Sequence, residues 1–244
     1  MRPEALSRRL LAEGIGSALL AATVVGSGIM AQRLAGGNVA IALLANTGAT
    51  VAVLYALIAL LGPVSGAHFN PAVSGIEALR GRLSWQEAAG YALIQILGCC
   101  AGAWLAHLMF ELPVWQLSTH VRSGPAQWLA EAVATFGLLL IVIGHRRPEE
   151  APLMVACWIG AAYWFTASTS FANPAITIAR SLTDTFAGIR PADMPAFICA
   201  QLIGAIMALG VGRVLFPATK PAELPVVESI SSPSDEKRSE AVNV

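Results

Sequence analysis

Charged residues are scarce in this chain. Only 12% of its 244 residues are Asp, Glu, Lys or Arg, against roughly 25% in soluble domains. Acidic and basic side chains balance to a net charge of zero, so we expect no nucleic-acid partner. Apolar residues make up 56% of the chain and the mean hydropathy is +0.65. This composition excludes a soluble enzyme with a large core and indicates an integral membrane protein.

Cysteine is also rare, and no cluster of metal-binding residues is evident. The four cysteines, Cys99, Cys100, Cys157 and Cys199, fall inside apolar stretches at spacings that match no metal motif. We expect them to pack as small apolar side chains, and we expect neither a metal site nor a cofactor. A membrane-embedded enzyme would need a nucleophile–base pair or metal ligands, which the sequence does not suggest.

Long apolar runs, by contrast, fill most of the chain. About 20 apolar residues cross a bilayer as a helix, and six runs predict such spans: 10–34, 40–61, 88–110, 128–143, 153–169 and 196–215. Two shorter pieces, 70–79 and 173–182, would reach roughly 15 Å as helices, which is half a bilayer. The predicted fold is therefore an all-α membrane protein with six transmembrane helices and two re-entrant half-helices.

Each short piece begins with the same tripeptide, Asn70-Pro71-Ala72 in one case and Asn173-Pro174-Ala175 in the other. Asn followed by Pro is typical of a helix start, because the Asn side chain accepts bonds from free backbone N–H groups and Pro carries none. In lipid, a helix can begin at mid-depth only beside a protein-lined cavity. We therefore predict that these two tripeptides meet at the centre of one pore.

The two halves of the chain repeat each other. Glu13 follows an Ala near the start of the first apolar run and Glu131 does the same in the fourth, while Gln95 in the third run corresponds to Gln201 in the sixth. Each half has three full spans, so the second half enters the membrane from the opposite side. The sequence thus predicts an inverted repeat.

The repeat and the composition together define the expected domain organisation. Residues 1–216 are predicted to form a single transmembrane domain with halves at about 8–110 and 126–216. Residues 217–244 are rich in Pro, Ser and charge, and we predict a disordered cytoplasmic tail there.

Basic residues between the apolar runs predict the orientation. Four lie on the side opposite the N-terminus, namely Arg33, Arg122, Arg180 and Arg190. The other eleven lie on the side of the N-terminus: Arg2, Arg8, Arg9, Arg80, Arg82, Arg146, Arg147, Arg213, Lys220, Lys237 and Arg238. Because Lys and Arg collect on the cytoplasmic side, we expect a multi-pass protein of the inner (plasma) membrane with both termini in the cytoplasm.

Paired Asn caps also predict what the pore conducts. Once the side-chain oxygen caps its helix, the amide NH₂ of each Asn is left to donate hydrogen bonds. The positive ends of both half-helix dipoles meet at the same point. A neutral solute oxygen can accept hydrogen bonds there, whereas a cation loses its water in a positive field. The pair therefore favours uncharged, hydrogen-bonding solutes.

With these features, the chain resembles the aquaporin and aquaglyceroporin (major intrinsic protein) family over about residues 8–216. The resemblance is carried by Ala12-Glu13, Ser65-Gly66-Ala67-His68-Phe69-Asn70-Pro71-Ala72-Val73, Tyr91 with Gln95, Ala130-Glu131, Asn173-Pro174-Ala175, and Gln201 with Gly204. It implies a pore in each subunit of a homotetramer. It also implies that Glu13 and Glu131 are buried and brace the re-entrant loops by accepting backbone N–H bonds, with a proton relay as the alternative role.

The chain departs from this family at the outer constriction. Family members usually carry an Arg three residues after the second Asn, where this chain has Ile176. Counted from the two Asn residues without gaps, the predicted filter is Thr50, Ala161, Ser170 and Ile176. A gap in this count would instead place Tyr163 or Trp164 in the filter. This small, uncharged ring predicts a wider opening than that of a water-only pore.

Two further residues are candidates for the vestibules. Arg180 lies one helical turn beyond Ile176, and we expect it in the outer vestibule, paired with Asp184 at i+4. The alternative is that Arg180 only anchors the short helix to carbonyls or to the headgroup region. His68 is expected either to face the inner vestibule or to brace its loop.

The predicted function is a passive channel for small neutral solutes: glycerol-like polyols, water, and neutral metalloid hydroxides such as arsenite. Arsenite is included because of the resemblance alone: some bacterial members of the family without the filter Arg are associated with metalloid transport. The alternatives are a water-selective aquaporin and a secondary active transporter. Transporters also use broken helices, but no unpaired ionisable residue for ion coupling is apparent near Asn70 or Asn173.

Overall fold

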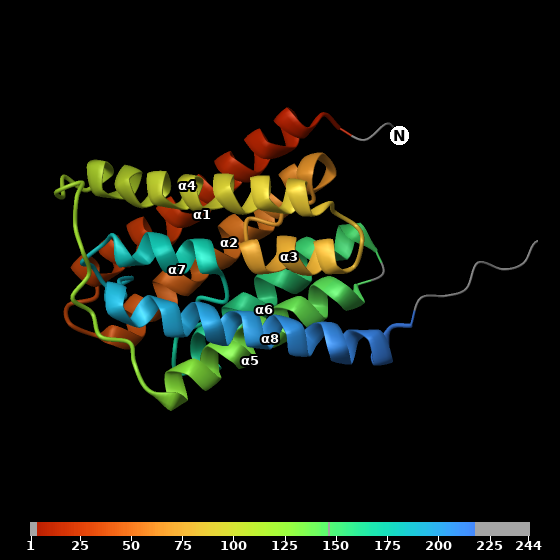
Figure 1. Cartoon of the computed structure of the whole chain (residues 1–244). Helices are drawn as coiled ribbons and strands as arrows, with labels where there is room; N and C mark the ends of the chain where they lie inside the picture. Colours follow the sequence, from red (N-terminus) through yellow and green to blue (C-terminus); the bar gives the residue numbers. More distant parts are fainter. Residues whose placement is uncertain (1–3, 146, 218–244) are drawn as a thin grey trace, which may run out of the picture.

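The computed structural model describes residues 4–145 and 147–217, and its regular structure over these ranges is entirely helical. The helices are α1 (Leu6–Leu34), α2 (Val39–Ser65), α3 (Pro71–Leu79), α4 (Trp85–Met109), α5 (Pro125–Gly144), α6 (Ala151–Phe165), α7 (Pro174–Ser181) and α8 (Met194–Leu215), with 3₁₀ turns at Pro148–Glu150 and Pro191–Asp193. In Figure 1 the long helices run side by side, and α3 and α7 lie among them.

Several sequence predictions lie outside the described residues. These are the tail from residue 218 onward and five of the basic residues used to predict the orientation: Arg2, Arg146, Lys220, Lys237 and Arg238.

Five helices are long and apolar enough to cross a membrane: α1, α2, α4, α5, and α8 with the turn before it. The sixth predicted span, 153–169, is shorter in the structure, because α6 has 15 residues and reaches roughly 22 Å. It ends where Thr166 takes an extended backbone conformation. The Thr166 hydroxyl donates to the carbonyl of Ala162, 2.6 Å away. The residues beyond leave the helix and form the loop that leads into α7.

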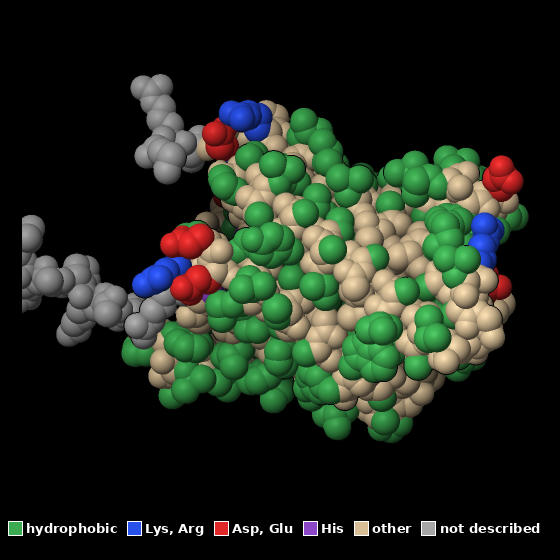
Figure 2. All heavy atoms as spheres, turned by 180° about the vertical axis from the view of Figure 1, so that it is seen from behind, with side chains coloured by type: hydrophobic (Ala, Val, Ile, Leu, Met, Phe, Trp, Pro, Cys, Tyr) green, Lys and Arg blue, Asp and Glu red, His purple; other side chains and the backbone are tan. Residues whose placement is uncertain are grey.

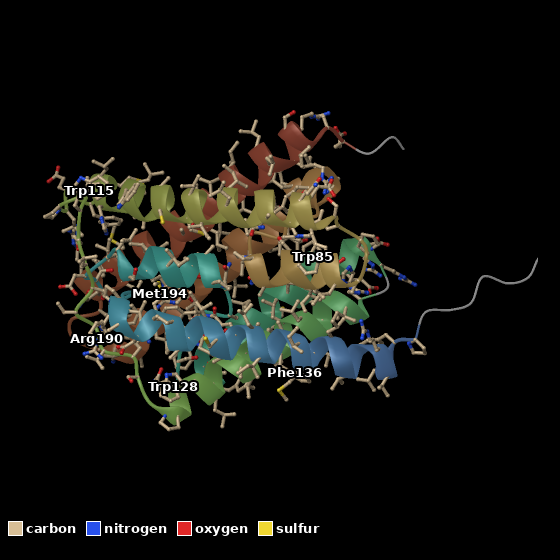
Figure 3. The ribbon with its side chains drawn as sticks, in the orientation of Figure 1. Trp85, Trp115, Trp128, Phe136, Arg190 and Met194 are labelled. Carbon is tan, nitrogen blue, oxygen red and sulfur yellow. The ribbon has the colours of Figure 1, made fainter. Side chains whose placement is uncertain are left out.

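The flank of the molecule matches a lipid environment. Figure 2 shows apolar side chains over most of the visible face and charged side chains at its two ends. Figure 3 places Trp115 and Arg190 at one end of the bundle and Trp85 toward the other. Large apolar side chains such as Leu44, Leu60 and Leu93 are exposed to their surroundings, as expected where lipid replaces water.

Glycines set the closest helix contacts in both halves. A Cβ atom on Gly98 would overlap the carbonyl of Gly14 where α4 crosses α1. In the second half, a Cβ atom on Gly204 would overlap the carbonyl of Ala132 where α8 crosses α5. Small residues let transmembrane helices approach this closely, so the same packing occurs twice.

The half-helices tie the two halves of the repeat together. α3 has 9 residues and α7 has 8, and they run from the middle of the bundle toward opposite ends (Figure 1). α3 contacts α8 of the other half, and α7 contacts α4. The predicted inverted repeat with two half-helices is therefore present, and it places both Asn residues at mid-depth.

Candidate functional site

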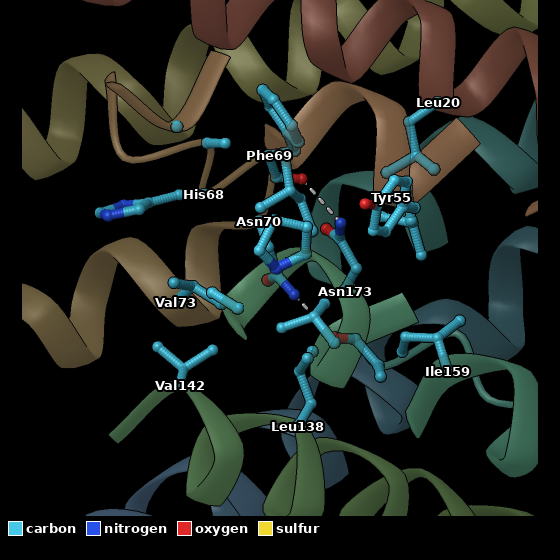
Figure 4. A pocket seen from close by; sticks show the side chains of 18 of the residues that line it. Leu20, Tyr55, His68, Phe69, Asn70, Val73, Leu138, Val142, Ile159 and Asn173 are labelled. Carbon is cyan, nitrogen blue, oxygen red and sulfur yellow. Dashed lines mark hydrogen bonds between the residues drawn. The ribbon is translucent and has the colours of Figure 1, made fainter. Parts of the chain in front are cut away.

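Asn70 and Asn173 cap the two half-helices and also bind each other's loops. Asn70 Oδ1 accepts from the backbone N–H of Ala72 at 2.9 Å, and Asn173 Oδ1 accepts from that of Ala175 at 2.9 Å. Across the junction, Asn70 Nδ2 donates to the carbonyl of Ala172 at 2.8 Å, and Asn173 Nδ2 donates to that of Phe69 at 2.7 Å. Figure 4 shows this reciprocal pair.

The reciprocal pair corrects one expectation. The sequence predicted that the whole amide NH₂ group of each Asn stays free for solute, whereas each group uses one of its two N–H donors to join the half-helices. One N–H per Asn remains for a passing molecule. Asn70 and Asn173 are 4% and 6% exposed, so these donors lie in a shielded site.

The loops before the two Asn residues share an unusual backbone. Ala67 and Phe69 have φ angles of 49° and 47°, and Ser170 and Ala172 have 49° and 48°. These are the positions three and one before each Asn. A non-glycine residue in the left-handed region costs on the order of 1–2 kcal/mol, so the rest of the structure must hold both loops in place.

This backbone leaves carbonyl groups without protein donors. In the described part of the chain, the carbonyls of Gly66, Ala67 and His68 in the first loop accept no hydrogen bond, and neither do those of Ser170 and Phe171 in the second. All five residues line the cavity described below. Backbone carbonyls without a protein donor are costly unless water or solute reaches them, so these five are candidate acceptors for solute hydroxyls.

Glu13 of α1 holds the first loop. Its two oxygens accept from the hydroxyl of Ser65 at 2.6 Å, the backbone N–H groups of His68 and Phe69 at 2.9 and 2.7 Å, and Nε2 of Gln95 at 2.8 Å. The side chain is fully buried. Four donors replace the water that a carboxylate would otherwise bind, which is what allows an anion at this depth.

Glu131 of α5 holds the second loop in the same way. It accepts from the backbone N–H groups of Phe171 and Ala172 at 2.8 and 2.9 Å and from Nε2 of Gln201 at 2.6 Å. Gln201 also donates to the Thr177 hydroxyl at 2.9 Å. Gln95 and Gln201, known from the sequence only as markers of the repeat, thus link each glutamate to its half-helix.

A cavity of about 730 Å³ runs past the Asn pair. Its wall includes Glu77, Arg82 and Glu149 toward the end of the bundle that holds the described termini, and Phe171 and Arg180 toward the other. Its lining includes the apolar side chains of Leu20, Val24, Leu54, Val73, Leu138, Val155, Ile159 and Ile176. The residues with the Asn amides and the unpaired loop carbonyls line it as well, so the cavity is amphipathic.

Three of the four predicted filter residues line this cavity: Thr50, Ser170 and Ile176. The structure does not place Ala161 there, because Ala161 lies on the exposed side of α6. Tyr163 is two residues further along α6, and two residues turn a helix by about 200°. Tyr163 lines the cavity instead, with its hydroxyl 3.4 Å from the Thr50 hydroxyl.

Arg180 also lines the cavity, but without the predicted partner. It is 3% exposed, its Nε donates to the carbonyl of Ala187, and its guanidinium lies over the ring of Phe171 at 3.4 Å from the centroid. Asp184 instead accepts from the backbone N–H and the hydroxyl of Thr119. The expected i+4 ion pair is therefore wrong, because the chain leaves the helix at Leu182 and turns Asp184 toward the linker between the halves.

His68 lines the cavity as well. Its Nδ1 lies 3.0 Å from the hydroxyl of Ser74, and its ring packs edge-on against Tyr91 with centroids 5.4 Å apart. The structure therefore places it on the cavity wall and in contact with its own half-helix. No group of three or more His, Cys, Asp or Glu side chains within the described ranges could hold a metal ion.

Known proteins with similar sequences show the family to which this chain belongs. The family model described as major intrinsic protein matches residues 1–167 of the chain. Aquaglyceroporin AqpS of Rhizobium meliloti (strain 1021) is 54% identical over 218 residues, which cover 88% of this chain and 93% of that protein. The chain belongs to the major intrinsic protein family.

Other relatives agree with this assignment. The probable glycerol uptake facilitator protein of Thermotoga maritima is 33% identical over 120 residues, covering 44% of this chain and 51% of that protein. The X-ray structure of the aquaglyceroporin from Plasmodium falciparum matches with a TM-score of 0.64 at 19% identity, covering 87% of this chain and 98% of that chain, which shows a shared fold. As a major intrinsic protein, the chain is a multi-pass membrane channel for the passive movement of small solutes, and not an enzyme.

Proposed function

We propose that this channel conducts glycerol-like polyols and neutral metalloid hydroxides such as arsenite, together with water. The observation that carries the proposal is the amphipathic cavity of about 730 Å³. A polyol has a row of hydroxyl groups on one side and carbon atoms on the other. The loop carbonyls and Asn N–H groups match the first side, and the apolar lining residues from Leu20 to Ile176 match the second. The name of the 54% identical relative, an aquaglyceroporin, supports the same solute class.

In this proposal, Asn70 and Asn173 supply the donors at the pore centre. Each holds one N–H free while its other N–H bridges the two loops. The N-termini of α3 and α7 bring their positive dipole ends to the same place, so a cation meets an unfavourable field there. Glu13 and Glu131 brace the loops, since their oxygens are filled by four and three donors.

The filter in this proposal is Thr50, Tyr163, Ser170 and Ile176. Ile176 leaves the position without a cation or a long polar side chain, which widens the path relative to a pore that carries Arg there. Tyr163 adds a bulky group whose hydroxyl can donate to or accept from a solute. This ring supports polyols over water alone as the solutes for which the channel is built.

We also propose the assembly and orientation of the protein. It is a homotetramer in the plasma membrane with a pore in each subunit and with both termini in the cytoplasm. Residues 1–216 form the transmembrane domain, and 217–244 form a cytoplasmic tail. The side of α3, Glu77 and Arg82 is then the inner side, and the side of α7 and Arg180 is the outer side. The distribution of basic residues along the sequence supports this orientation.

The experiment is stopped-flow light scattering on proteoliposomes that contain the full chain, with water, glycerol and arsenite as separate solutes. The expected result is rapid, non-saturating glycerol and arsenite entry well above that of empty liposomes. Water flux without glycerol flux would replace the proposal with a water-selective channel. Glycerol uptake that saturates and follows an imposed proton gradient would replace it with a transporter.

A further inference from the structure

Two guanidinium groups share one aromatic ring at the end of the cavity away from the described termini. The Cζ atoms of Arg180 and Arg122 lie 3.4 and 5.2 Å from the centroid of the Phe171 ring. The two charges are therefore within about 10 Å of each other, roughly the Debye length at 0.1 M salt. Dissolved ions screen them from each other only in part, so the pair makes a local concentration of positive charge.

Neither arginine has an acidic partner in the described ranges. None of the ion pairs there includes Arg122 or Arg180. Three nearby carboxylates are held by other groups: Glu131 by the second loop and Gln201, Asp184 by Thr119, and Asp193 by Arg190 and the backbone N–H of Arg122. Because buried charges are normally paired, the partner suited to these two cations is an anion from solution.

The terminal nitrogens of Arg180 are accessible from the cavity. Its Nε donates to the carbonyl of Ala187, whereas neither Nη atom donates to a group in the described part of the chain. The Nη atoms are not among the polar atoms there that are both fully buried and without a partner, so each has some accessible surface. Arg180 lines the cavity and is otherwise buried, at 3% exposed. This surface therefore opens into the cavity, and two free Nη groups match an oxyanion in bidentate geometry.

The ring under Arg180 keeps the guanidinium in place before any anion arrives. The backbone N–H of Phe171 donates to Glu131 at 2.8 Å, and the Phe171 ring packs edge-on against Phe197 with centroids 5.2 Å apart. Stacking on such a fixed ring occupies one face of the guanidinium and leaves its in-plane N–H groups free to donate. A preorganised donor loses little entropy on binding, which favours association with a small anion.

The nearby His120 reflects the same excess of positive charge. Partial burial, and then the charges of Arg122 and Arg180, hold the pKa of its imidazole below the ordinary value, against the opposing effect of Asp184. His120 belongs to the linker between the halves, where its backbone carbonyl accepts from the N–H of Arg190 at 2.7 Å. The positive potential thus extends from Arg180 to the linker.

We propose that Arg180, in the electric field of Arg122, forms a binding site for a small dissolved oxyanion at the outer end of the pore. The anion accepts hydrogen bonds from the Nη groups and obstructs the path of neutral solutes. It does not pass inward, because it would have to shed its water beside Ile176. A lipid headgroup is not the source, since Arg180 lines the cavity and not the lipid-facing flank. The inference rests on the proposed function for the orientation that makes this the outer end.

The test measures glycerol entry into proteoliposomes that contain the full chain, in sodium sulfate or in sodium chloride of equal ionic strength and osmolality. The same salt is present on both sides of the membrane, so the orientation of the channels does not matter. Block follows the ratio of sulfate concentration to its dissociation constant, and flux falls to about one third at twice that constant. We expect saturable block by sulfate, with a dissociation constant in about the millimolar range, and weaker block by chloride.

Four variants locate the site. R180Q should abolish the sulfate block, and R180K should weaken it, because Lys keeps the charge but loses the bidentate geometry. R122Q should raise the sulfate dissociation constant only about twofold, since Arg122 acts through its charge at a distance. R33Q is the matched control: Arg33 lies over the Phe110 ring at 5.2 Å, is exposed, and does not line the cavity. It should keep the block of the unmodified chain.

Three results would overturn the site. They are sulfate block no greater than chloride block, equal block in R180Q and the unmodified chain, and a loss of block in R33Q as large as in R180Q. If R180Q does not fold, R180K and R122Q decide, and unchanged dissociation constants in both would overturn it. An unmodified chain without glycerol flux would instead refute the proposed function. Water flux measured in parallel then reports the block, so the two failures are distinguishable.

Discussion

The two half-helices are nearly equivalent around their Asn residues but opposite one turn later. Three residues after each Asn lies an apolar side chain, Val73 or Ile176. Four residues after it lies a hydroxyl side chain that accepts a hydrogen bond from the glutamine of the same half, Gln95 or Gln201. Seven residues after it, the first half has Glu77 and the second has Arg180. Both line the cavity, at opposite ends of the Asn pair.

These two side chains differ in their surroundings as well as in the sign of their charge. Glu77 is neutralised by Arg80 at 2.6 Å and by Arg82 at 3.6 Å, and it needs nothing from a solute. Arg180 has no carboxylate and rests on an aromatic ring. The comparison shows that a repeat can keep the chemistry of its centre while equivalent positions further along carry opposite charges in different surroundings. The four predictions below compare the two halves more widely, from the largest effect to the smallest.

Glu13 and Glu131 should both be essential for stability, and Glu13 should contribute slightly more. E13Q and E131Q each place an amide NH₂ against backbone N–H groups, so at least one buried donor loses its acceptor. Each lost buried bond to a charged group costs about 1.5–3 kcal/mol, and we expect E13Q to lose more stability because Glu13 has four donors and Glu131 three. Thermal unfolding in detergent measures the difference. Wild-type stability in both variants would contradict the role of these carboxylates.

Replacing Ile176 with an arginine should narrow the wide pore that we propose. Ile176 lines the cavity and is 4% exposed, so I176R brings a long charged side chain into the ring. We expect glycerol entry to fall at least about tenfold, which is 1.4 kcal/mol of added barrier, while water entry persists. I176L, of equal volume, is the control and should stay near the unmodified rate. Unchanged glycerol uptake in I176R would rule out the wide filter.

The Tyr163 hydroxyl should have a smaller effect than the side chain at position 176. It is 3.4 Å from the Thr50 hydroxyl, which is a weak interaction to lose. We expect Y163F to lower the glycerol-to-water ratio by about twofold, which corresponds to the lower end of the range of about 0.5–1.5 kcal/mol for a neutral hydrogen bond. A161S on the exposed side of α6 should leave the ratio unchanged. A larger effect of A161S than of Y163F would restore the gap-free filter.

The smallest effect concerns the contact between the loop after α7 and the linker between the two halves, at Asp184 and Thr119. The backbone N–H and hydroxyl of Thr119 hold the pKa of Asp184 below its ordinary value. A carboxyl with a lowered folded-state pKa stabilises the protein above its unfolded pKa, and this contribution is lost as pH falls through the folded pKa. We expect the melting temperature of the unmodified chain to drop by about 1 °C more than that of D184N on acidification below pH 4. Parallel curves for the two proteins would show that this contact has no effect.

Local patterns account for most of the fold. Apolar runs of membrane-spanning length, Asn before Pro, and the repeated Glu and Gln positions are all readable along the chain. They predict helices, helix starts and the two-fold layout, because hydrophobic length and capping depend on neighbouring residues only. The shortened α6 is the exception. Its end at Phe165 depends on how the following loop is drawn toward Glu131.

The site was predictable in part. The Asn pair and three of the four predicted filter residues line the cavity, as counting along the chain placed them. Counting did not place Ala161 there, because the loop between α6 and α7 has no regular rise per residue and the rotation of α6 is set by packing. The reciprocal Asn bonds were also missed, since they join residues about 100 positions apart.

By itself, then, the sequence determined that this is a membrane-spanning inverted repeat with two Asn-capped half-helices and no cation at position 176. Only the tertiary structure decided which groups line the cavity and what they contact: Tyr163 rather than Ala161, one remaining N–H per Asn, and Arg180 over the Phe171 ring without Asp184. The physical reason is the range of the interactions. Capping and hydrophobic burial act between neighbours in the chain, whereas the partner of a buried polar group depends on which distant segments the fold brings to it.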